Sequence, residues 1–329
     1  MKFGIEFVPY KPINKIVDLA KKAEDAGIEY CWVTDHYNNR NVYVTLASIA
    51  TATKKIILGP GATNPFLVHP AAAASSIASI DEMSGGRATF GIAAGDRTVL
   101  DSLGIEFKKP IRAINEEIMI IRKLLDGEAV NFEGEFFKLR NTKLNFKPSH
   151  RLPIYVGAQG PKLLMFAGKV GDGVLVNASN PIDLGHAVTE IAKGVKIAER
   201  KMEVLDIATY TSFSVASSHT KAVEAAKPVV AFIVSSTSEA VLKRHDISVG
   251  EVSLVKEELG KGKFDKAAAA VTEKMLDTFS VYGTPAECIK KISELSAMHV
   301  TQFVMGSPLG PEPSAAIDII RNEIMPKFQ

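Results

Sequence analysis

A single carboxylate, Glu6, lies in the middle of the apolar segment KFGIEFVPY near the start of the chain. Period-two alternation places Phe3, Ile5 and Phe7 on one face of a strand and Glu6 beside Val8 on the other, so both faces are expected to be buried. A buried carboxylate needs either a cationic partner or a raised pKa, because desolvation opposes its ionisation. Glu6 is therefore a candidate acid–base group.

Polar residues and glycines also end most of the other apolar segments. They are Asp35 and His36 in TDH, Gly61, Ala62, Thr63 and Asn64 in GATN, Ala94, Gly95 and Asp96 in AAGD, Gly157, Ala158, Gln159 and Gly160 in GAQG, and Asn177 in VNAS. Structural interpretations stay open for each motif. Asp35 and His36 can cap backbone groups, Asp96 can be structural, and GAQGPK can be a turn into a helix begun by Pro161. Glycines before a helix N-terminus also form an anion cradle.

The elements that position these residues alternate between short apolar strands and longer helices. We predict eight strands, at 2–9, 29–35, 54–60, 87–95, 152–160, 172–179, 206–216 and 300–308, each followed by helical sequence. Near-continuous apolar strands in this order are typical of a TIM barrel, whose active site forms at the carboxyl ends of the strands. A doubly wound sheet fits less well, because the first turn, VPYKP, has no glycine-rich fingerprint.

Two segments exceed simple connections, and neither resembles a linker. Residues about 128–151 are expected to form a small β insertion, and residues about 220–297 a helical insertion between the seventh and eighth strands. The helical insertion is apolar enough to pack on the barrel or on a neighbouring subunit. We therefore predict one domain over residues 1–329, and the sequence leaves open whether the second insertion is an interface or a lid.

Charge and composition favour a small-molecule partner over nucleic acid. The 39 Lys and Arg nearly balance the 37 Asp and Glu, and no basic run is present. We find no signal peptide and no apolar run near the roughly 20 residues of a membrane span, so a cytoplasmic location is expected. Cys31 and Cys288 lie far apart, which argues against a disulfide framework and fits a reducing compartment.

Two common enzyme chemistries find no matching motif in the sequence. The seven histidines show no metal-ligand spacing such as HxH or HExxH, so no metal site is expected. The chain contains no GxSxG, which disfavours a serine hydrolase.

Taken together, the strand-end motifs resemble a known family along essentially the whole chain. The matching stretches are GIEFVP, TDHYNNRNVYVTLASIA, LGPGATNPFLVHP, SGGRATFGIAAGD, GAQGPK, GVLVNASNP and VVAFIVSS. They resemble the bacterial luciferase-like flavin and deazaflavin enzymes, and within them the coenzyme F420-dependent 5,10-methylenetetrahydromethanopterin reductases of methanogenic archaea. The resemblance implies a TIM (β/α)8 barrel with insertions, homo-oligomers (dimer or tetramer), and F420 as cosubstrate.

The resemblance also implies roles for single residues. Asp35 and His36 would lie beside the deazaflavin ring, Thr63 and Asn64 at its polar edge, and Ala94, Gly95 and Asp96 along the ring and side chain. Gly157, Ala158, Gln159, Gly160, Lys162 and Leu163 would bind the side-chain phosphate, in agreement with the anion cradle. A non-prolyl cis peptide is implied between Gly61 and Ala62.

The implied reaction gives Glu6 a task. Hydride transfer from reduced F420 to 5,10-methylenetetrahydromethanopterin requires a proton on a ring nitrogen, which opens the ring to an iminium ion. We expect Glu6 to donate that proton and to contact the substrate, with help from Asp96 and Asn177. The alternatives are another F420-dependent dehydrogenase with His36 as base, an FMN-dependent monooxygenase, and a non-catalytic relative that only binds a cofactor.

Overall fold

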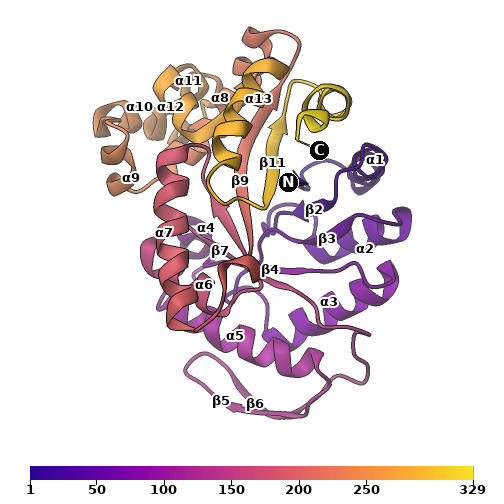
Figure 1. Ribbon diagram of the computed structural model, residues 1–329. Coiled ribbons are helices and arrows are strands. Elements are labelled where there is room, and N and C mark those ends of the chain that lie inside the picture. The colour runs from indigo at the N-terminus through magenta and orange to yellow at the C-terminus, as the bar shows by residue number, and fades with distance from the viewer. Residues whose placement is uncertain (329) are drawn as a thin grey trace. The chain divides into compact units, whose positions relative to one another are not determined.

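A computed structural model of the protein describes residues 1–328. Eight strands recur along the chain, and each is followed by at least one helix (Figure 1). The strands are β1 (Lys2–Phe7), β2 (Tyr30–Val33), β3 (Ile57–Pro60), β4 (Phe90–Ile92), β7 (Ile154–Ala158), β8 (Gly173–Asn177), β9 (Asp206–Val215) and β11 (Gln302–Leu309). This alternation is that of a (β/α)8 barrel and confirms the predicted fold class.

The helices between the strands differ widely in length. Those before β9 are α1 (Ile13–Asp25), α2 (Val42–Ala52), α3 (Pro70–Ser84), α4 (Arg97–Ser102), α5 (Pro110–Leu125), α6 (Pro161–Val170), α7 (Pro181–Ile197) and the 3₁₀ turn η1 (Met202–Val204). Those after β9 are α8 (His219–Ser236), α9 (Glu239–Arg244), α10 (Val249–Gly260), α11 (Phe264–Ala269), α12 (Glu273–Phe279), α13 (Pro285–Ser296), α14 (Pro313–Ile319), the π turn η2 (Ile320–Ile324) and the 3₁₀ turn η3 (Met325–Lys327). The sequence explains where α1 ends, because Gly27 takes the left-handed φ of 86° that favours glycine.

The chain divides into two compact units. The N-terminal unit comprises Gly4–Val176 and Thr189–Ala208, and the C-terminal unit comprises Met1–Phe3, Asn177–Val188 and the chain from Thr209 onward. The single domain expected over residues 1–329 stays a prediction.

Six parallel strands form the sheet of the N-terminal unit. β1 pairs with β2 and β2 with β3, while β4 pairs with β7 and β7 with β8. Parallel bridges from Leu58 to Ala88 and from Thr63 to Ile92 join the two sets through β3 and β4. The carboxyl ends of neighbouring strands therefore lie at one edge, which is where a barrel of this type carries its site.

Apolar and aromatic side chains fill the N-terminal unit beneath that edge. Trp32 is fully buried, and its ring lies 5.1 Å from that of Tyr155 in an edge-to-face contact. Along the outside, α1, α2, α3 and α5 pack in succession, each against the next. Figure 1 shows these helices one after another along the outside of the N-terminal unit.

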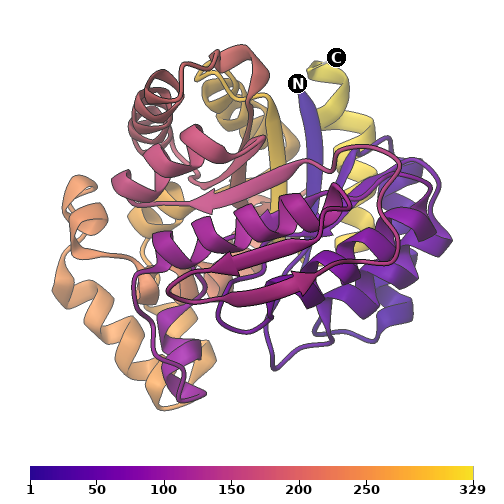
Figure 2. The same ribbon diagram turned by 90° about the horizontal axis from the view of Figure 1, so that it is seen from below.

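A β-hairpin occupies the segment expected to be a β insertion. Its strands β5 (Val130–Glu133) and β6 (Lys138–Thr142) pair antiparallel and lie against α5, as Figure 2 shows. Glu116 of α5 fixes the hairpin turn, because its carboxylate accepts backbone N–H groups of Glu135 at 3.0 Å and Phe136 at 2.9 Å. The Glu116 side chain thus anchors the backbone of the hairpin turn to α5, which is a structural role.

Helices α8 to α13 and the short strand β10 lie between β9 and β11 in the C-terminal unit. The helices α8, α10, α11 and α12 pack together around a buried apolar core that includes Val230, Val255 and Met275. Strand β10 (Ser280–Gly283) pairs parallel with β9, and α13 packs on it. The sequence analysis expected only helices here and missed β10, because four residues directly after a helical pattern carry too short a period-two signal.

Candidate active site

Glu6 lies one residue before the end of β1, at the site edge of the N-terminal unit. In register, Glu6 pairs with Trp32, and Trp32 pairs with Gly59. Ile5 and Phe7 are buried as expected, but Glu6 is only partly buried. The expectation that the face carrying Glu6 is buried was wrong, because Glu6 lies near the carboxyl end of β1 and stays partly exposed.

Asp35 and Thr63 form a polar pair beside this strand end. The Thr63 hydroxyl, which is buried, donates a hydrogen bond of 2.7 Å to Oδ2 of Asp35. Burial raises the pKa of Asp35, and the Thr63 hydrogen bond and the neighbouring His36 oppose that rise only in part. His36 itself is exposed. The Gly61–Ala62 peptide bond just before Thr63 is cis.

Asn64 and Gly95 lie against each other at the ends of β3 and β4. The buried Asn64 side chain accepts the backbone N–H of Phe66 at 3.1 Å. Gly95 has a φ of 80°, and a Cβ at this position would lie 3.2 Å from the Asn64 Cβ. Ala94 is partly buried beside it. Only glycine suits both the backbone conformation and the space here.

Asp96 has the structural role that the sequence analysis left open. It is exposed and caps the N-terminus of α4, accepting the backbone N–H of Thr98 at 2.7 Å and that of Val99 at 3.3 Å. N-caps of this kind contribute about 1 kcal/mol to stability. Any part that Asp96 plays in the reaction stays a prediction.

The GAQG turn leads from β7 into the N-terminus of α6. A Cβ on Gly157 would lie 2.9 Å from the Ala93 Cβ, so the turn packs closely against the chain after β4. Gly160 is the N-cap, offers no side-chain hydrogen bond to α6, and has open space where a Cβ would be. The free N–H groups and the helix dipole favour an anion there. Lys162 is exposed in the first turn, and Leu163 is partly buried.

The structure brings most of the predicted residues to one edge of the N-terminal unit. The strand ends that carry Glu6, Asp35, Thr63, Gly95 and Gly157 follow one another around the sheet. Asn177 ends β8, belongs to the C-terminal unit and has an exposed side chain.

The arrangement combines a partly exposed carboxylate, a hydrogen-bonded Asp–Thr pair and a helix N-terminus without a side-chain cap. Residues 2–302 match the family model described as luciferase-like monooxygenase. The chain belongs to this luciferase-like family. A match of this extent covers every strand end described above.

Curated relatives of this luciferase-like chain match it over essentially its full length. It is 47% identical to the 5,10-methylenetetrahydromethanopterin reductase of Archaeoglobus fulgidus over 333 residues, covering 100% of both chains. It is 45% identical to the protein of the same name from Methanolobus tindarius, covering 99% of this chain and 100% of the relative.

A solved structure of the luciferase-like family shares the whole fold. The coenzyme F420 dependent tetrahydromethanopterin reductase from Methanopyrus kandleri superposes with a TM-score of 0.96 and is 41% identical. The match covers 100% of this chain and 99% of that one. Insertions and barrel strands are therefore arranged alike along both chains.

Two buried groups of the N-terminal unit of this luciferase-like chain escaped the sequence analysis. They are Glu117 of α5 and the hydroxyl of Tyr43 on α2, and no hydrogen-bond partner reaches either within residues 1–328. A signal for Glu117 is present in the sequence: Ala113, Ile114, Ile118 and Ile121 form the apolar stripe of α5, and Glu117 lies within it. A carboxylate within an apolar helix stripe is as unusual as one within an apolar strand.

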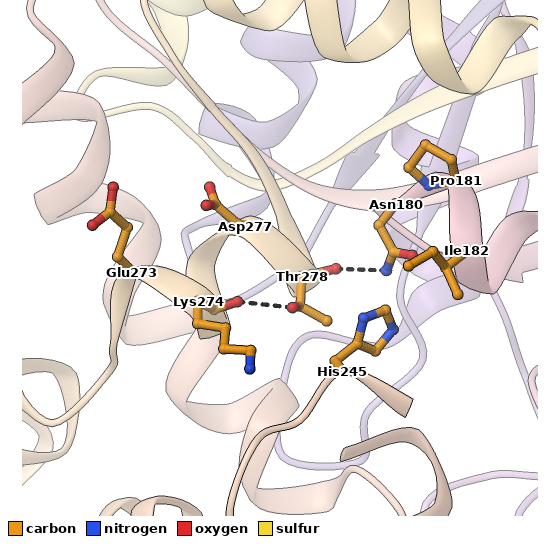
Figure 3. A pocket seen from close by; sticks show the side chains of 8 residues that line it. All are labelled: Asn180, Pro181, Ile182, His245, Glu273, Lys274, Asp277 and Thr278. Carbon is orange, nitrogen blue, oxygen red and sulfur yellow. Dashed lines mark hydrogen bonds between the residues drawn. The ribbon is translucent and has the colours of Figure 1, made fainter. Parts of the chain in front are cut away.

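A separate pocket of about 370 Å³ lies within the C-terminal unit, and none of the predicted site residues lines it. Figure 3 shows its side chains, with Asn180 donating to the Thr278 carbonyl at 3.0 Å. Asp183, which does not line the pocket, accepts hydrogen bonds from Arg244 at 2.6 Å and from the pocket residue His245 at 2.9 Å. Burial opposes ionisation of Asp183, but these bonds and one from Asn180 hold its pKa below the usual range. The cluster is thus a satisfied structural network.

Other expected features concern metals, membranes and cysteines. Within residues 1–328, no three His, Cys, Asp or Glu side chains gather as metal ligands would. In the same part of the chain, no helix has the length and apolar character needed to cross a bilayer. Cys31 and Cys288 are buried and unpaired, and burial raises the pKa of each thiol to about 12. Neither thiol is a nucleophile at neutral pH.

Proposed function

We propose that this protein is an F420-dependent 5,10-methylenetetrahydromethanopterin reductase. It transfers a hydride from reduced coenzyme F420 to 5,10-methylenetetrahydromethanopterin and yields 5-methyltetrahydromethanopterin, in a reversible step of one-carbon metabolism and methanogenesis. The observation that carries this proposal is 47% identity over the full length of a reductase of that name. The polar strand ends of the N-terminal unit support it.

The residues present fit F420 as a cosubstrate. The uncapped N-terminus of α6 suits a phosphate, and Gly160 leaves room for one. Gly95 and the Asp35–Thr63 pair offer close backbone approach and a polar edge for a planar ring. We assign cosubstrate binding to Asp35, His36, Gly61, Ala62, Thr63, Asn64, Ala94, Gly95, Gly157, Ala158, Gln159, Gly160, Lys162 and Leu163.

Glu6 acts as the general acid in this proposal. When bound, reduced F420 supplies the hydride. The carboxyl group of Glu6 donates its proton to a nitrogen of the five-membered ring of the substrate, the adjacent C–N bond breaks, and the methylene carbon becomes an electrophilic iminium carbon. Hydride addition converts that carbon to the methyl group and leaves Glu6 as a carboxylate, which solvent reprotonates at the open mouth. Asp96 and Asn177 position the pterin.

An anaerobic assay of the purified protein tests this function. With reduced F420 and 5,10-methylenetetrahydromethanopterin, we expect oxidised F420 and methyl product to form in equal amounts. NADPH and FMNH2 in place of reduced F420 are expected to give no turnover. Copurified FMN with oxygen uptake points instead to a monooxygenase, and F420 reduction by an alcohol or a sugar phosphate points to a dehydrogenase with His36 as base.

The anion cradle at α6 leads to a separate prediction about affinity. Lys162→Glu places a negative charge in the first turn of α6, and we expect the Kd for F420 to rise about tenfold. Lys169→Glu, in the last turn of the same helix, is the matched control and is expected to change the Kd less than twofold. Fluorescence titration of oxidised F420 measures both, and equal effects of the two variants contradict a phosphate site at Gly160.

We also propose a cytoplasmic homo-oligomer that binds small molecules and no nucleic acid. The near balance of 39 basic and 37 acidic residues supports the last point. Phe232, Val249, Leu254 and Phe264 expose large apolar side chains on the helices of the C-terminal unit, which supports a subunit interface there. Light scattering of the purified protein distinguishes monomer, dimer and tetramer.

A further inference from the structure

The β-hairpin contacts the segment that leads from β3 into α3. This segment begins with Asn64, one of the predicted cosubstrate residues, and ends at His69, the N-cap of α3. The ring centroids of Phe136 in the hairpin turn and Phe66 lie 6.2 Å apart in an edge-to-face contact. The next hairpin residue, Phe137, has its ring centroid 5.8 Å from that of His69. Two consecutive residues of the hairpin therefore hold the segment at two separate points.

A third phenylalanine packs on Phe66 from another direction. Phe107 belongs to the segment between α4 and α5, and its ring centroid lies 5.6 Å from that of Phe66. Phe66, Phe107 and Phe136 are all partly buried and are here called the phenylalanine cluster. Its members come from three segments that are far apart in the sequence. The cluster therefore joins the chain after β3 to the chain after α4 and to the hairpin turn.

The hairpin turn is itself fixed, so that Phe136 is a firm support for Phe66. The buried carboxylate of Glu116 accepts the backbone N–H of Phe136 at 2.9 Å and that of Phe137 at 3.3 Å. It also accepts a hydrogen bond of 2.7 Å from Arg112, one turn earlier in α5. Burial opposes ionisation of Glu116, but these bonds hold its pKa below the usual range. The carboxylate that anchors the turn is therefore ionised at neutral pH.

Asn64 is the site residue that this packing orients. Its Oδ1 accepts the backbone N–H of Phe66 at 3.1 Å and that of Leu67 at 3.2 Å. Only the oxygen of an amide accepts such bonds, so they determine which way the Asn64 amide is turned. Its donor atom, Nδ2, makes no hydrogen bond within residues 1–328. Asn64 also packs on Gly95, because a Cβ on Gly95 would lie 3.2 Å from the Asn64 Cγ.

We propose that Phe136 is a positioning residue of the active site: through Phe66 it holds the Asn64 amide so that Nδ2 donates a hydrogen bond to the bound cosubstrate. The identity of that cosubstrate rests on the proposed function above. Phe136 acts through Phe66 and not by direct contact with a reactant. An amide that is already oriented in the free protein loses little conformational entropy on binding, so the phenylalanine cluster favours affinity.

Titration of F420 with single and double variants tests this role. Phe136→Ala is expected to raise the Kd for oxidised F420 about tenfold, the effect of one well-placed hydrogen bond. Phe136→Leu keeps an apolar side chain against Phe66 and should stay within about threefold of wild type. In an Asn64→Ala background, Phe136→Ala should change the Kd less than about twofold, because the group through which it acts is gone. A tenfold effect in both backgrounds contradicts action through Asn64.

Hydrogen exchange gives a readout that needs no F420. A peptide that covers residues 64–69 contains the Phe66 and Leu67 amides that Asn64 binds. In the free protein, this peptide should take up deuterium about tenfold faster in Phe136→Ala than in wild type, because the segment opens more readily. Equal rates in the two proteins contradict a hold by Phe136 on this segment.

A matched control comes from the same hairpin. Phe132 on β5 is partly buried like Phe136, but within residues 1–328 its ring makes no aromatic contact with the phenylalanine cluster. Phe132→Ala should leave both the F420 affinity and the exchange of residues 64–69 unchanged. Equal effects of Phe132→Ala and Phe136→Ala indicate general loosening of the hairpin and overturn the positioning role. Failure of the proposed function looks different, since wild type then binds no F420 while the exchange difference stands.

Discussion

Replacing Glu6 by glutamine lowers kcat by about 100-fold to 10,000-fold, the loss typical of a missing general acid. Glutamine keeps the volume and polarity of the side chain but has no proton to give to the ring nitrogen. Glu6 lies at the end of β1 and not in the proposed phosphate cradle at α6. The substitution leaves the contacts of the F420 phosphate unaltered, so the Kd for F420 should stay within about threefold of wild type. Anaerobic steady-state kinetics and fluorescence titration measure the two quantities.

The control for Glu6 is an exposed glutamate elsewhere in the same unit. Glu128→Gln, after α5, also removes one carboxylate and should leave kcat unchanged. Near wild-type kcat in Glu6→Gln with F420 still bound rules out Glu6 as the acid. Parallel losses in kcat and F420 affinity indicate instead that Glu6 organises the site.

Glu117 makes the stability of the protein depend on pH. The pKa of Glu117 rises from 4.5 to about 8 on folding, so between these values the folded state binds more protons than the unfolded state. The free energy of unfolding therefore falls as pH rises through this window, by up to about 1.4 kcal/mol per pH unit, and becomes level above the folded pKa. The full span corresponds to a loss of about 5 kcal/mol as an upper bound.

Glu117→Gln removes this dependence. Between pH 5 and pH 8.5, we expect the difference in free energy of unfolding between variant and wild type to shift by at least about 2 kcal/mol in favour of the variant. Any effect of the amide on stability that is the same at both pH values cancels in this comparison. Urea unfolding of both proteins at the two pH values measures this difference. Parallel pH dependence of wild type and variant shows that Glu117 does not titrate on unfolding in this window.

The strands of this fold were predictable because their apolar runs are long and regular. Seven of the eight strands that alternate with helices fall within the predicted ranges, β11 extends one residue beyond its range to Leu309, and the hairpin strands β5 and β6 fall within the predicted β insertion. Strand β10 was not predictable in this way, because its formation depends on pairing with another strand. Residues Ser280–Gly283 form a strand by pairing in parallel with β9, and a four-residue segment carries no information about that partner by itself.

Site residues were predictable where they follow strands, and less so where packing determines their environment. Asp35 and Thr63 meet because parallel strands end at one edge, as the barrel count implies. The burial of Glu6 was overestimated, because its distance from the barrel mouth depends on where β1 ends. Glu117 was missed because a helix interior is not a usual place to look for an acid, although its position in the apolar stripe was visible.

Deuterium labelling of the hydride tests most directly the central claim that this protein transfers a hydride from reduced F420 to 5,10-methylenetetrahydromethanopterin. Reduced F420 that carries two deuterium atoms at its hydride-donating carbon is mixed anaerobically with the protein and 5,10-methylenetetrahydromethanopterin in ordinary water. The deuterium content of the methyl product is then measured by mass spectrometry. Direct transfer predicts one deuterium in the methyl group and none at exchangeable positions. A methyl group without deuterium, formed at the same rate, contradicts the account.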